Sequence, residues 1–394
     1  MKVSKLKFNY NFSFLFLWMM ILTIPSSLLF KVNVIGIEFS ISYIFLALFI
    51  LVSILSYFFI IHFDFSIFRK KVFLGFILSF LMFSLNSLYN GIEIKYFLFL
   101  TTFLASIVTG FLYSEQIQKY FQKQFKGITY VLVLIGLILY YFNIPLFDFE
   151  SAGSKLYFTN SFGYYRLSSI FLNPNSFAYF LLLYFSIYLY SKKKTIENIM
   201  MLFVSLAFIL TESRSAISGL FLIFLIYNYQ YFKQKILLFK LSIFGLLFGF
   251  VFLLTFTSDS LLVEYDIRFT KFSIALQYIF ESLNYFLLGI PPGIPIEKNG
   301  ISFSDNMFLY LMLKMGIIPF ILFVYGYFYS IFKASKILFK TKNIALKPYA
   351  LFLVATLPPM FFSNLLLFSP VYILIGLAIG VLEKGVRYEK SIGS

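Results

Sequence analysis

Long runs of apolar residues without a charge recur along the whole chain, and short polar or basic segments separate them. Runs such as residues 41–61 show no alternation of apolar and polar positions, which a membrane β-strand would require. Their length and composition predict transmembrane helices. We predict about twelve spans. They occupy residues 12–30, 40–61, 72–89, 96–113, 128–143, 172–190, 197–211, 214–231, 236–257, 305–332, 348–364 and 366–382.

The first run follows three lysines and resembles a signal peptide, but it reaches Phe30 without a small-residue cleavage site. We therefore expect an uncleaved first span. The seventh span is short and the turn between the last two, around Ser363 and Asn364, is tight, so each is also compatible with a re-entrant or tilted element. Because no repeat, linker or soluble domain is evident, residues 1–394 are expected to form a single transmembrane domain.

The composition agrees with a membrane protein, since 61% of residues are hydrophobic and only 12% are charged. Soluble domains carry about 25% charged residues. The fold class predicted is therefore an all-α polytopic membrane protein.

The formal net charge of +16 reflects topology rather than nucleic-acid binding. With the N-terminus inside, 23 of the 32 basic residues fall in inner segments, and 11 of the 16 acidic residues fall in outer ones. Every predicted inner segment holds at least three cations, which satisfies the positive-inside rule. This distribution places both termini in the cytoplasm.

Two predicted outer segments, residues 144–171 and 258–304, are long, and long loops in compact proteins are usually functional. Within the second, apolar residues from Arg268 to Phe286 follow helical spacing, which predicts an amphipathic helix on the membrane interface. The Gly- and Pro-rich stretch from Gly289 to Gly293 then predicts a loop.

Several kinds of chemistry are disfavoured by composition. The chain has no cysteine and one histidine, His62, at the inner end of the second span, so a zinc site or an outer Ser-His-Asp triad is not expected. No Walker or Rossmann glycine motif is present, so we expect no nucleotide or other cofactor.

Only five of the basic residues are arginines, and three of them, Arg166, Arg214 and Arg268, lie singly in predicted outer segments. Arg69 and Arg387 lie in inner basic clusters instead. Arginine presents a planar fork of donors that grips phosphate at two points, which lysine does not. The outer arginines therefore indicate an anionic group, a phosphate or pyrophosphate, at the outer surface.

Arg166 precedes a predicted helix start. Asn173 is a suitable N-cap and Pro174 a suitable first residue for the sixth span, followed by Asn175. The helix dipole and free amides there form an anion site. A capped helix beside a snorkelling arginine explains the same residues.

Glu212 and Arg214 lie at the outer junction of the seventh and eighth spans, with almost no loop. Ionisable groups so close to the bilayer often mark function. The alternative is a structural ion pair in which Glu212 and Arg214 neutralise each other.

Two further segments complete the candidates. Arg268 with Lys271 fits either an anion contact or anchoring to lipid headgroups. Asp305, at the start of the tenth span, fits the commoner role of N-cap and also a carboxylate base. Lys314 lies about two and a half turns further on and should face a cavity or an anion.

Residues 160–325 carry these motifs in the order found in the O-antigen ligase and polymerase superfamily, which they resemble. The matching elements are Arg166 with Phe171-Leu172-Asn173-Pro174-Asn175, then Thr211-Glu212-Ser213-Arg214-Ser215-Ala216, Arg268, Gly289 to Gly293, Asp305-Asn306-Met307-Phe308-Leu309, and Gly316-Ile317.

The resemblance implies a GT-C-like membrane glycosyltransferase in the bacterial cytoplasmic membrane, acting on undecaprenyl-pyrophosphate-linked glycans at the outer face. Arg166, Arg214, Arg268 and Lys314 would bind the pyrophosphate, with Asn173 and Asn175 beside them. Asp305, or else Glu212, would be the catalytic base. A flippase and a chain-length regulator are the partners implied.

One departure from the family pattern bears on the reaction. Ligases have histidine where this chain has Asp305, whereas polymerases of the Wzy type vary there. We therefore expect an inverting polymerase of oligosaccharide repeat units for capsule, O-antigen or exopolysaccharide. The alternatives are an O-antigen ligase, a lipid-linked oligosaccharide flippase, and a membrane scaffold or receptor, which would not need the outer arginines.

Overall fold

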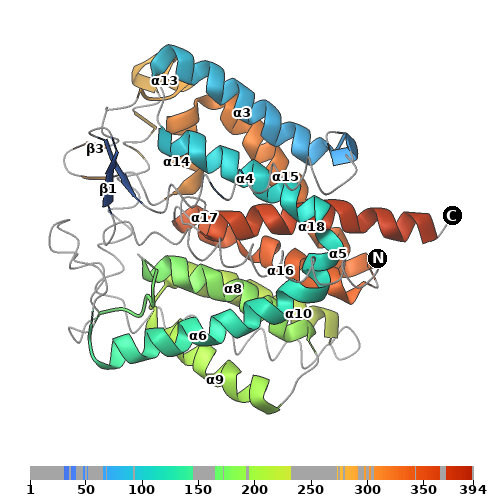
Figure 1. Cartoon of the computed structure of the whole chain (residues 1–394). Helices are drawn as coiled ribbons and strands as arrows, with labels where there is room; N and C mark the ends of the chain where they lie inside the picture. Colours follow the sequence, from blue (N-terminus) through green and yellow to red (C-terminus); the bar gives the residue numbers. More distant parts are fainter. Residues whose placement is uncertain are drawn as a thin grey trace.

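The computed structural model is a helix bundle in which α18 runs through the middle (Figure 1). Helices α3, α4, α14 and α15 lie on one side of it, and α6, α8, α9 and α10 lie on the other (Figure 1). The residues described by the structure are 31–34, 37–40, 48, 51, 65–67, 69–91, 94–144, 165–171, 173–191, 195–231, 273, 276–277, 280–291, 297–298, 301–302, 306–341, 343–363 and 370–392.

The principal helices are α3 (Lys71–Asn90), α4 (Ile94–Leu112), α6 (Gln122–Tyr141), α8 (Pro174–Tyr190), α9 (Thr195–Leu210), α10 (Arg214–Tyr231), α13 (Leu283–Leu288), α14 (Met307–Met315), α15 (Ile317–Lys340), α16 (Lys347–Ala355), α17 (Leu357–Phe362) and α18 (Val371–Ile392). Shorter turns are η1 (Phe65–Ile67), α5 (Ser114–Gln116), η2 (Ile117–Phe121) and η4 (Ile344–Leu346). The strands form two antiparallel hairpins, β1 (Lys31–Val34) with β2 (Ile37–Ser40), and β3 (Glu297–Lys298) with β4 (Ile301–Ser302).

Four helical segments in the described part of the chain are long and apolar enough to cross a membrane. These are Lys71–Tyr89, Ser114–Tyr141, Ile317–Lys340 and Ile344–Phe361. Tyr96–Leu112 and Thr195–Leu210 are shorter apolar helices. The chain is therefore a helical membrane protein, with its short hairpins in segments predicted to connect spans. The predicted first, second and ninth spans lie mostly or wholly outside the described residues, as does His62.

The tightest helix packing joins α4 to α18, where glycines let the two backbones meet. A side chain at Gly380 would place its Cβ 2.1 Å from the Ile107 carbonyl oxygen, and one at Gly110 would lie 2.3 Å from that of Leu377. Such contact is possible only without a Cβ, as in other membrane helix pairs that approach through small residues. This pair forms the centre of the buried core, while α15 packs along α3.

The fifth predicted span begins earlier than expected. The sequence predicts residues 128–143, whereas the helical segment runs from Ser114 to Tyr141 and includes one π-helical stretch, Ile117–Phe121. The Tyr349 hydroxyl donates to the Ile117 carbonyl at 3.1 Å, so an acceptor in this irregular stretch is satisfied. The basic residues assigned to a loop therefore belong to the helix.

The prediction of one helix over 305–332 is wrong, because the backbone breaks at Gly316 between α14 and α15. Gly316 has φ +80°, and an added Cβ would lie 2.3 Å from the Leu287 carbonyl oxygen. The Asn86 amide donates to the Met315 carbonyl at 2.9 Å, and the Ile290 backbone N–H donates to the Leu313 carbonyl at 2.7 Å. Partners from distant segments thus satisfy the carbonyls beside the break.

The eleventh predicted span is one helical segment from Ile344 to Phe361, with a turn at Thr356 between α16 and α17. Thr356 keeps helical backbone angles, φ −76° and ψ −15°, and its hydroxyl pairs with that of Tyr327 at 2.6 Å. One further prediction of continuous helix needs correction. In the predicted amphipathic helix, the described residues Ser273, Leu276, Gln277 and Phe280 are helical, but Ser282 is extended and interrupts the run before α13. Gly289 ends α13 with φ +87°, as the glycine pattern predicts.

Candidate functional site

The start of α8 forms as the sequence predicts. Asn173 is extended, with φ −134° and ψ 132°, and its side-chain oxygen accepts from the Asn175 backbone N–H at 2.8 Å. Pro174 occupies the first helical position, where its missing N–H costs no helical hydrogen bond. The cap fixes the backbone of Asn175, the second residue of α8.

Arg166 joins two segments that the sequence analysis singled out separately. Its Nε donates to the Thr211 carbonyl at 2.8 Å, and its Nη2 donates to the Asn175 side-chain oxygen at 3.3 Å. Beside these contacts, the Leu167 backbone N–H donates to the Leu210 carbonyl at 3.0 Å. The chain before α8 is thereby held against the turn between α9 and α10. We call the end of the bundle where Arg166 and Arg214 lie the arginine end.

The segment carrying Arg166 is also anchored to α6. The Tyr165 backbone N–H donates to the Asn143 side chain at 3.0 Å, and the Ser169 hydroxyl donates to the Leu132 carbonyl at 2.7 Å. Ser169 has φ +53°, a conformation that a residue with a side chain adopts rarely. Contacts on both sides of Arg166 therefore restrict where its guanidinium can lie.

The turn between α9 and α10 exposes the two charged residues predicted there. Thr211 is buried, and its hydroxyl donates to the Phe208 carbonyl at 2.7 Å. Glu212 and Arg214 are exposed, and Glu212 has φ +50°. Residues with a Cβ rarely adopt this left-handed conformation, and those that do are often found at functional sites. The turn thus presents one carboxylate and one guanidinium beside Arg166.

Asn306, not Asp305, caps α14. Its side-chain oxygen accepts from the backbone N–H groups of Phe308 at 3.0 Å and Leu309 at 3.1 Å. The same side chain donates to the Phe361 carbonyl at 3.1 Å, near the end of α17. Of the two roles left open for Asp305, that of N-cap belongs to Asn306 instead. Asp305 itself lies outside the described residues, as do Arg268 and Lys271.

Lys314 lies apart from this group, in the last turn of α14. Its Nζ is 5.6 Å from the ring centre of Tyr96 on α4, and the Tyr96 hydroxyl is hydrogen-bonded to that of Tyr310. Because Gly316 ends the helix directly after it, Lys314 stands beside a backbone break rather than inside a continuous span. The structure thus brings together Arg166, Asn173, Asn175, Glu212 and Arg214, and places Lys314 on the α4 side of α14.

Tyr179 and Ser363 belong to the arginine end, although the sequence analysis did not select them. The buried Tyr179 hydroxyl is hydrogen-bonded to those of Ser215, at the start of α10, and Ser363, after α17. The chain has 30 tyrosines, so a tyrosine inside an apolar span does not stand out in the sequence as a functional residue. Its role depends on contacts across three helices, which no local pattern records.

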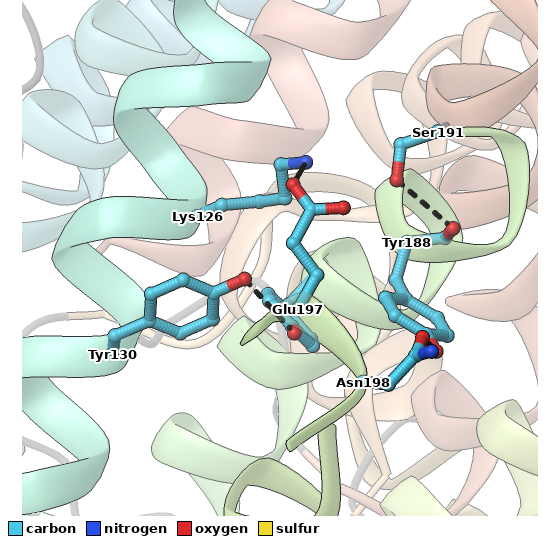
Figure 2. Close-up of polar contacts among 7 residues, drawn as sticks. Lys126, Tyr130, Tyr188, Ser191, Glu197 and Asn198 are labelled. Atoms are coloured by element: carbon cyan, nitrogen blue, oxygen red, sulfur yellow. Dashed lines mark hydrogen bonds and ion pairs between the residues drawn. The ribbon is translucent and has the colours of Figure 1, made fainter. Parts of the chain in front are cut away.

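A second polar group lies at the opposite end of α6, α8 and α9, which we call the lysine end. Figure 2 shows Lys126 of α6 reaching Glu197 of α9, at 2.5 Å, with Tyr130 and Tyr188 on either side. The Tyr188 hydroxyl donates to the Asn198 side chain at 2.7 Å, and Ser191 donates to the Tyr188 carbonyl at 3.1 Å. The side chains of Lys126 and Glu197 are 12% and 15% exposed. These contacts bind α9 to its neighbours at the end remote from Arg166.

The arginine end has the properties of an anion site. Helices α8 and α10 begin there, so the positive ends of their dipoles lie beside two guanidinium groups. Among the described residues, no group of three or more His, Cys, Asp or Glu side chains could hold a metal ion. No protein-family model matches the chain, and no curated protein matches its sequence.

Proposed function

We propose that this protein polymerises undecaprenyl-pyrophosphate-linked oligosaccharide repeat units into capsule, O-antigen or exopolysaccharide. The arginine end faces outward from a bacterial cytoplasmic membrane, in a bundle of about twelve spans with a GT-C-like arrangement. The charge distribution along the sequence supports this orientation, because 23 of the 32 basic residues fall in segments assigned to the inner side.

The observation that carries the proposal is the contact of Arg166 with both Thr211 and Asn175. It unites the Arg166–Asn175 element with the Thr211–Ala216 element, the two motifs on which the superfamily resemblance chiefly rests. A resemblance built on unrelated short motifs would give no reason for them to meet. Their meeting at helix N-termini also gives the pyrophosphate a site with matching charge.

The proposed reaction is a single displacement at an anomeric carbon. The growing glycan on undecaprenyl pyrophosphate is the donor. One repeat unit on another molecule of the same lipid carrier is the acceptor. An acceptor hydroxyl forms the new C–O bond as the bond from the anomeric carbon to pyrophosphate oxygen breaks, so the sugar centre inverts. The hydroxyl proton passes to a carboxylate, and undecaprenyl pyrophosphate leaves with the bonding electrons.

Each candidate side chain has a role in this step. Arg214 and Arg166, with Arg268 from the following loop, stabilise the charge that builds on the leaving pyrophosphate. Asp305 is the base that takes the proton, and Glu212 is the second candidate. Asn173 and Asn175 order the start of α8 beside the pyrophosphate. Lys314 is the weaker fourth cation, because it lies over the ring of Tyr96 on α4, apart from the arginine end.

Transport of a lipid-linked oligosaccharide is the second candidate function. The interruption at Gly316 favours it, since transporters often bind their substrates at discontinuous helices. In such transporters the interruptions recur in corresponding positions of two repeats. Here the break at Gly316 lies in the C-terminal third of the chain.

Deletion of the gene followed by gel analysis of the glycan separates the candidates. Loss of polymerisation leaves single-repeat products, and this is the result we expect. Intact polymer retained on its lipid carrier would indicate ligase activity instead. Loss of all surface glycan, with repeat units trapped at the inner face, would indicate transport.

Arg214→Lys tests the pyrophosphate site directly. The change keeps the positive charge but removes the two-point fork, so we expect polymerisation to fall by roughly 10²–10³. The rate is measured with full-length protein in proteoliposomes and lipid-linked repeat units extracted from the deletion strain. Arg69→Lys, an exposed arginine in a basic cluster before α3, is the matched control and should keep the wild-type rate. A wild-type rate for Arg214→Lys would contradict the proposal.

A further inference from the structure

Tyr179 connects the helices that carry the two halves of the proposed site. Its hydroxyl is hydrogen-bonded to Ser215, one residue after Arg214, and to Ser363, the residue that follows α17. Tyr179 itself is completely buried on α8, less than two turns from the Asn173 cap. One phenol oxygen thus ties α8, α10 and α17 together.

The connection continues from α17 to α14. The carbonyl of Phe361, two residues before Ser363, accepts from the Asn306 side chain at 3.1 Å. The Phe308 and Phe361 rings also lie 5.0 Å apart between their centres. Asn306 directly follows Asp305 in the chain. Its contact with α17 therefore links α17 to the segment that carries the proposed base.

A path of direct contacts therefore runs from Arg214 to Asn306, the residue that follows the proposed base in the chain. It passes from Arg214 through Ser215, Tyr179 and Ser363 to the end of α17. From there the Asn306 side chain leads to the start of α14. Rates of bond transfer depend steeply on such placement, since a misplacement of about 1 Å can cost 10²-fold.

We propose that Tyr179 is a positioning residue that sets the arginine-bearing start of α10 relative to the start of α14. This inference rests on the proposed function and adds a residue to it. Tyr179 does not touch the reacting atoms, because its side chain is buried among the three helices. It acts by holding Arg214, at the start of α10, in a fixed position relative to the start of α14 while the sugar transfers.

Tyr179→Phe removes the hydroxyl and keeps the ring that fills the core. We expect kcat to fall between roughly tenfold and 100-fold, while KM for the lipid-linked donor changes by less than about twofold. The full-length protein is assayed in proteoliposomes, with lipid-linked glycan from the deletion strain as the probe. A merely structural tyrosine would lower the amount of folded protein and leave kcat per folded molecule unchanged.

Tyr349→Phe is the matched control. Tyr349 is equally buried, and its hydroxyl is hydrogen-bonded to the Ile117 carbonyl and the Gln122 side chain, but it lies on α16 away from the arginines. We expect its kcat to equal that of the wild type. An equal loss in both variants would show that any missing buried hydroxyl slows the enzyme, and would overturn the inference.

Ser363→Ala and Ser215→Ala each remove one of the two hydrogen bonds of the Tyr179 hydroxyl, so they test the bridge from Ser215 through Tyr179 to Ser363 if Tyr179→Phe does not fold. Each variant should lower kcat. Wild-type rates for Tyr179→Phe, or for both serine variants, would overturn the positioning role. Arg214→Lys in the same assay separates the two claims. A normal rate for Arg214→Lys sinks the proposed function, whereas normal rates confined to the bridge variants sink only this inference.

Discussion

Asn306 makes two kinds of contact at the start of α14, and the difference matters for interpreting its neighbour. It caps the helix through Phe308 and Leu309, and it donates to the Phe361 carbonyl across the interface with α17. The residue before it, Asp305, is therefore not needed for capping. The proposed reaction assigns its carboxylate the role of base.

Asp305→Asn should consequently affect activity, whereas Asn306→Ala should affect stability. We expect Asp305→Asn to abolish polymerisation and leave the unfolding free energy near that of the wild type. Asn306→Ala should lower that free energy by about 1–2 kcal/mol, through loss of the cap and of the bond to Phe361. Thermal unfolding in detergent measures stability, and proteoliposome turnover measures activity.

Asn306→Asp is the control for the second change, since it keeps the cap acceptor and loses only the donor to Phe361. It should recover part of the lost stability. If Asp305→Asn destabilised the protein as much as Asn306→Ala, the division of roles between the two neighbours would be refuted.

At the scale of elements, the break between α14 and α15 is held from both sides. Gly289 and Gly316 lie against each other, since an added Cβ at Gly289 would be 2.9 Å from the Gly316 nitrogen. The Ile290–Leu313 hydrogen bond runs beside them. The end of the long loop and the interrupted helix are thus one packed unit, and each glycine allows the other's backbone to approach.

Gly316→Ala should disrupt this unit. The new Cβ needs a left-handed backbone and space occupied by the Leu287 carbonyl oxygen, so we expect a loss of more than about 2 kcal/mol in unfolding free energy. Gly127→Ala is the matched control, because no atom lies within 4 Å of its added Cβ inside α6. That variant should be as stable as the wild type or gain up to about 1 kcal/mol.

Thermal unfolding of the two glycine variants in the same detergent provides the comparison. Equal stability would mean that the close contact at Gly316 is not required for the fold.

Helix positions were largely predictable and helix breaks were not, for a physical reason. Apolar length locates a span, so α3, α4, α8, α9 and α10 lie close to their predicted ranges. The apolar run itself does not predict the break at Gly316, because that break depends on Leu287 and Gly289 approaching from elsewhere; only the superfamily resemblance implies a helix end at Gly316-Ile317. Asn173 was predictable because its cap is local, whereas Tyr179 was not because its partners are Ser215 and Ser363.

At the scale of the whole molecule, the bundle separates two kinds of polar chemistry. The arginine end exposes Glu212 and Arg214. Among the described acids predicted to face inward, Glu197 pairs with Lys126 and Glu383 pairs with Lys333 at 2.7 Å, whereas Glu115 is exposed. A count of charges along the sequence predicts which end is positive but not which acids are paired.

The shortness of α8 and α9 has a consequence for the membrane around them. With 17 and 16 residues, they rise only about 26 and 24 Å, whereas a bilayer's hydrocarbon core is about 30 Å thick. In the proposed arrangement both helices cross the bilayer, and α8 is buried inside the bundle. The lipids beside α9 must therefore thin, or the arginine end must lie below the headgroup level. Either adjustment brings a prenyl-anchored phosphate, which enters from the lipid, nearer to Arg166 and Arg214.

Polymerisation should accordingly depend on acyl-chain length. Thicker bilayers raise the cost of mismatch by fractions of a kcal/mol per Å, so a change of several Å should slow turnover by up to roughly tenfold. Proteoliposomes made from lipids of increasing chain length, at constant headgroup, measure the effect. An unchanged rate over this series would mean that hydrophobic thickness does not govern access to the arginine end. A declining rate would make bilayer thickness a determinant of how much surface polysaccharide the cell assembles.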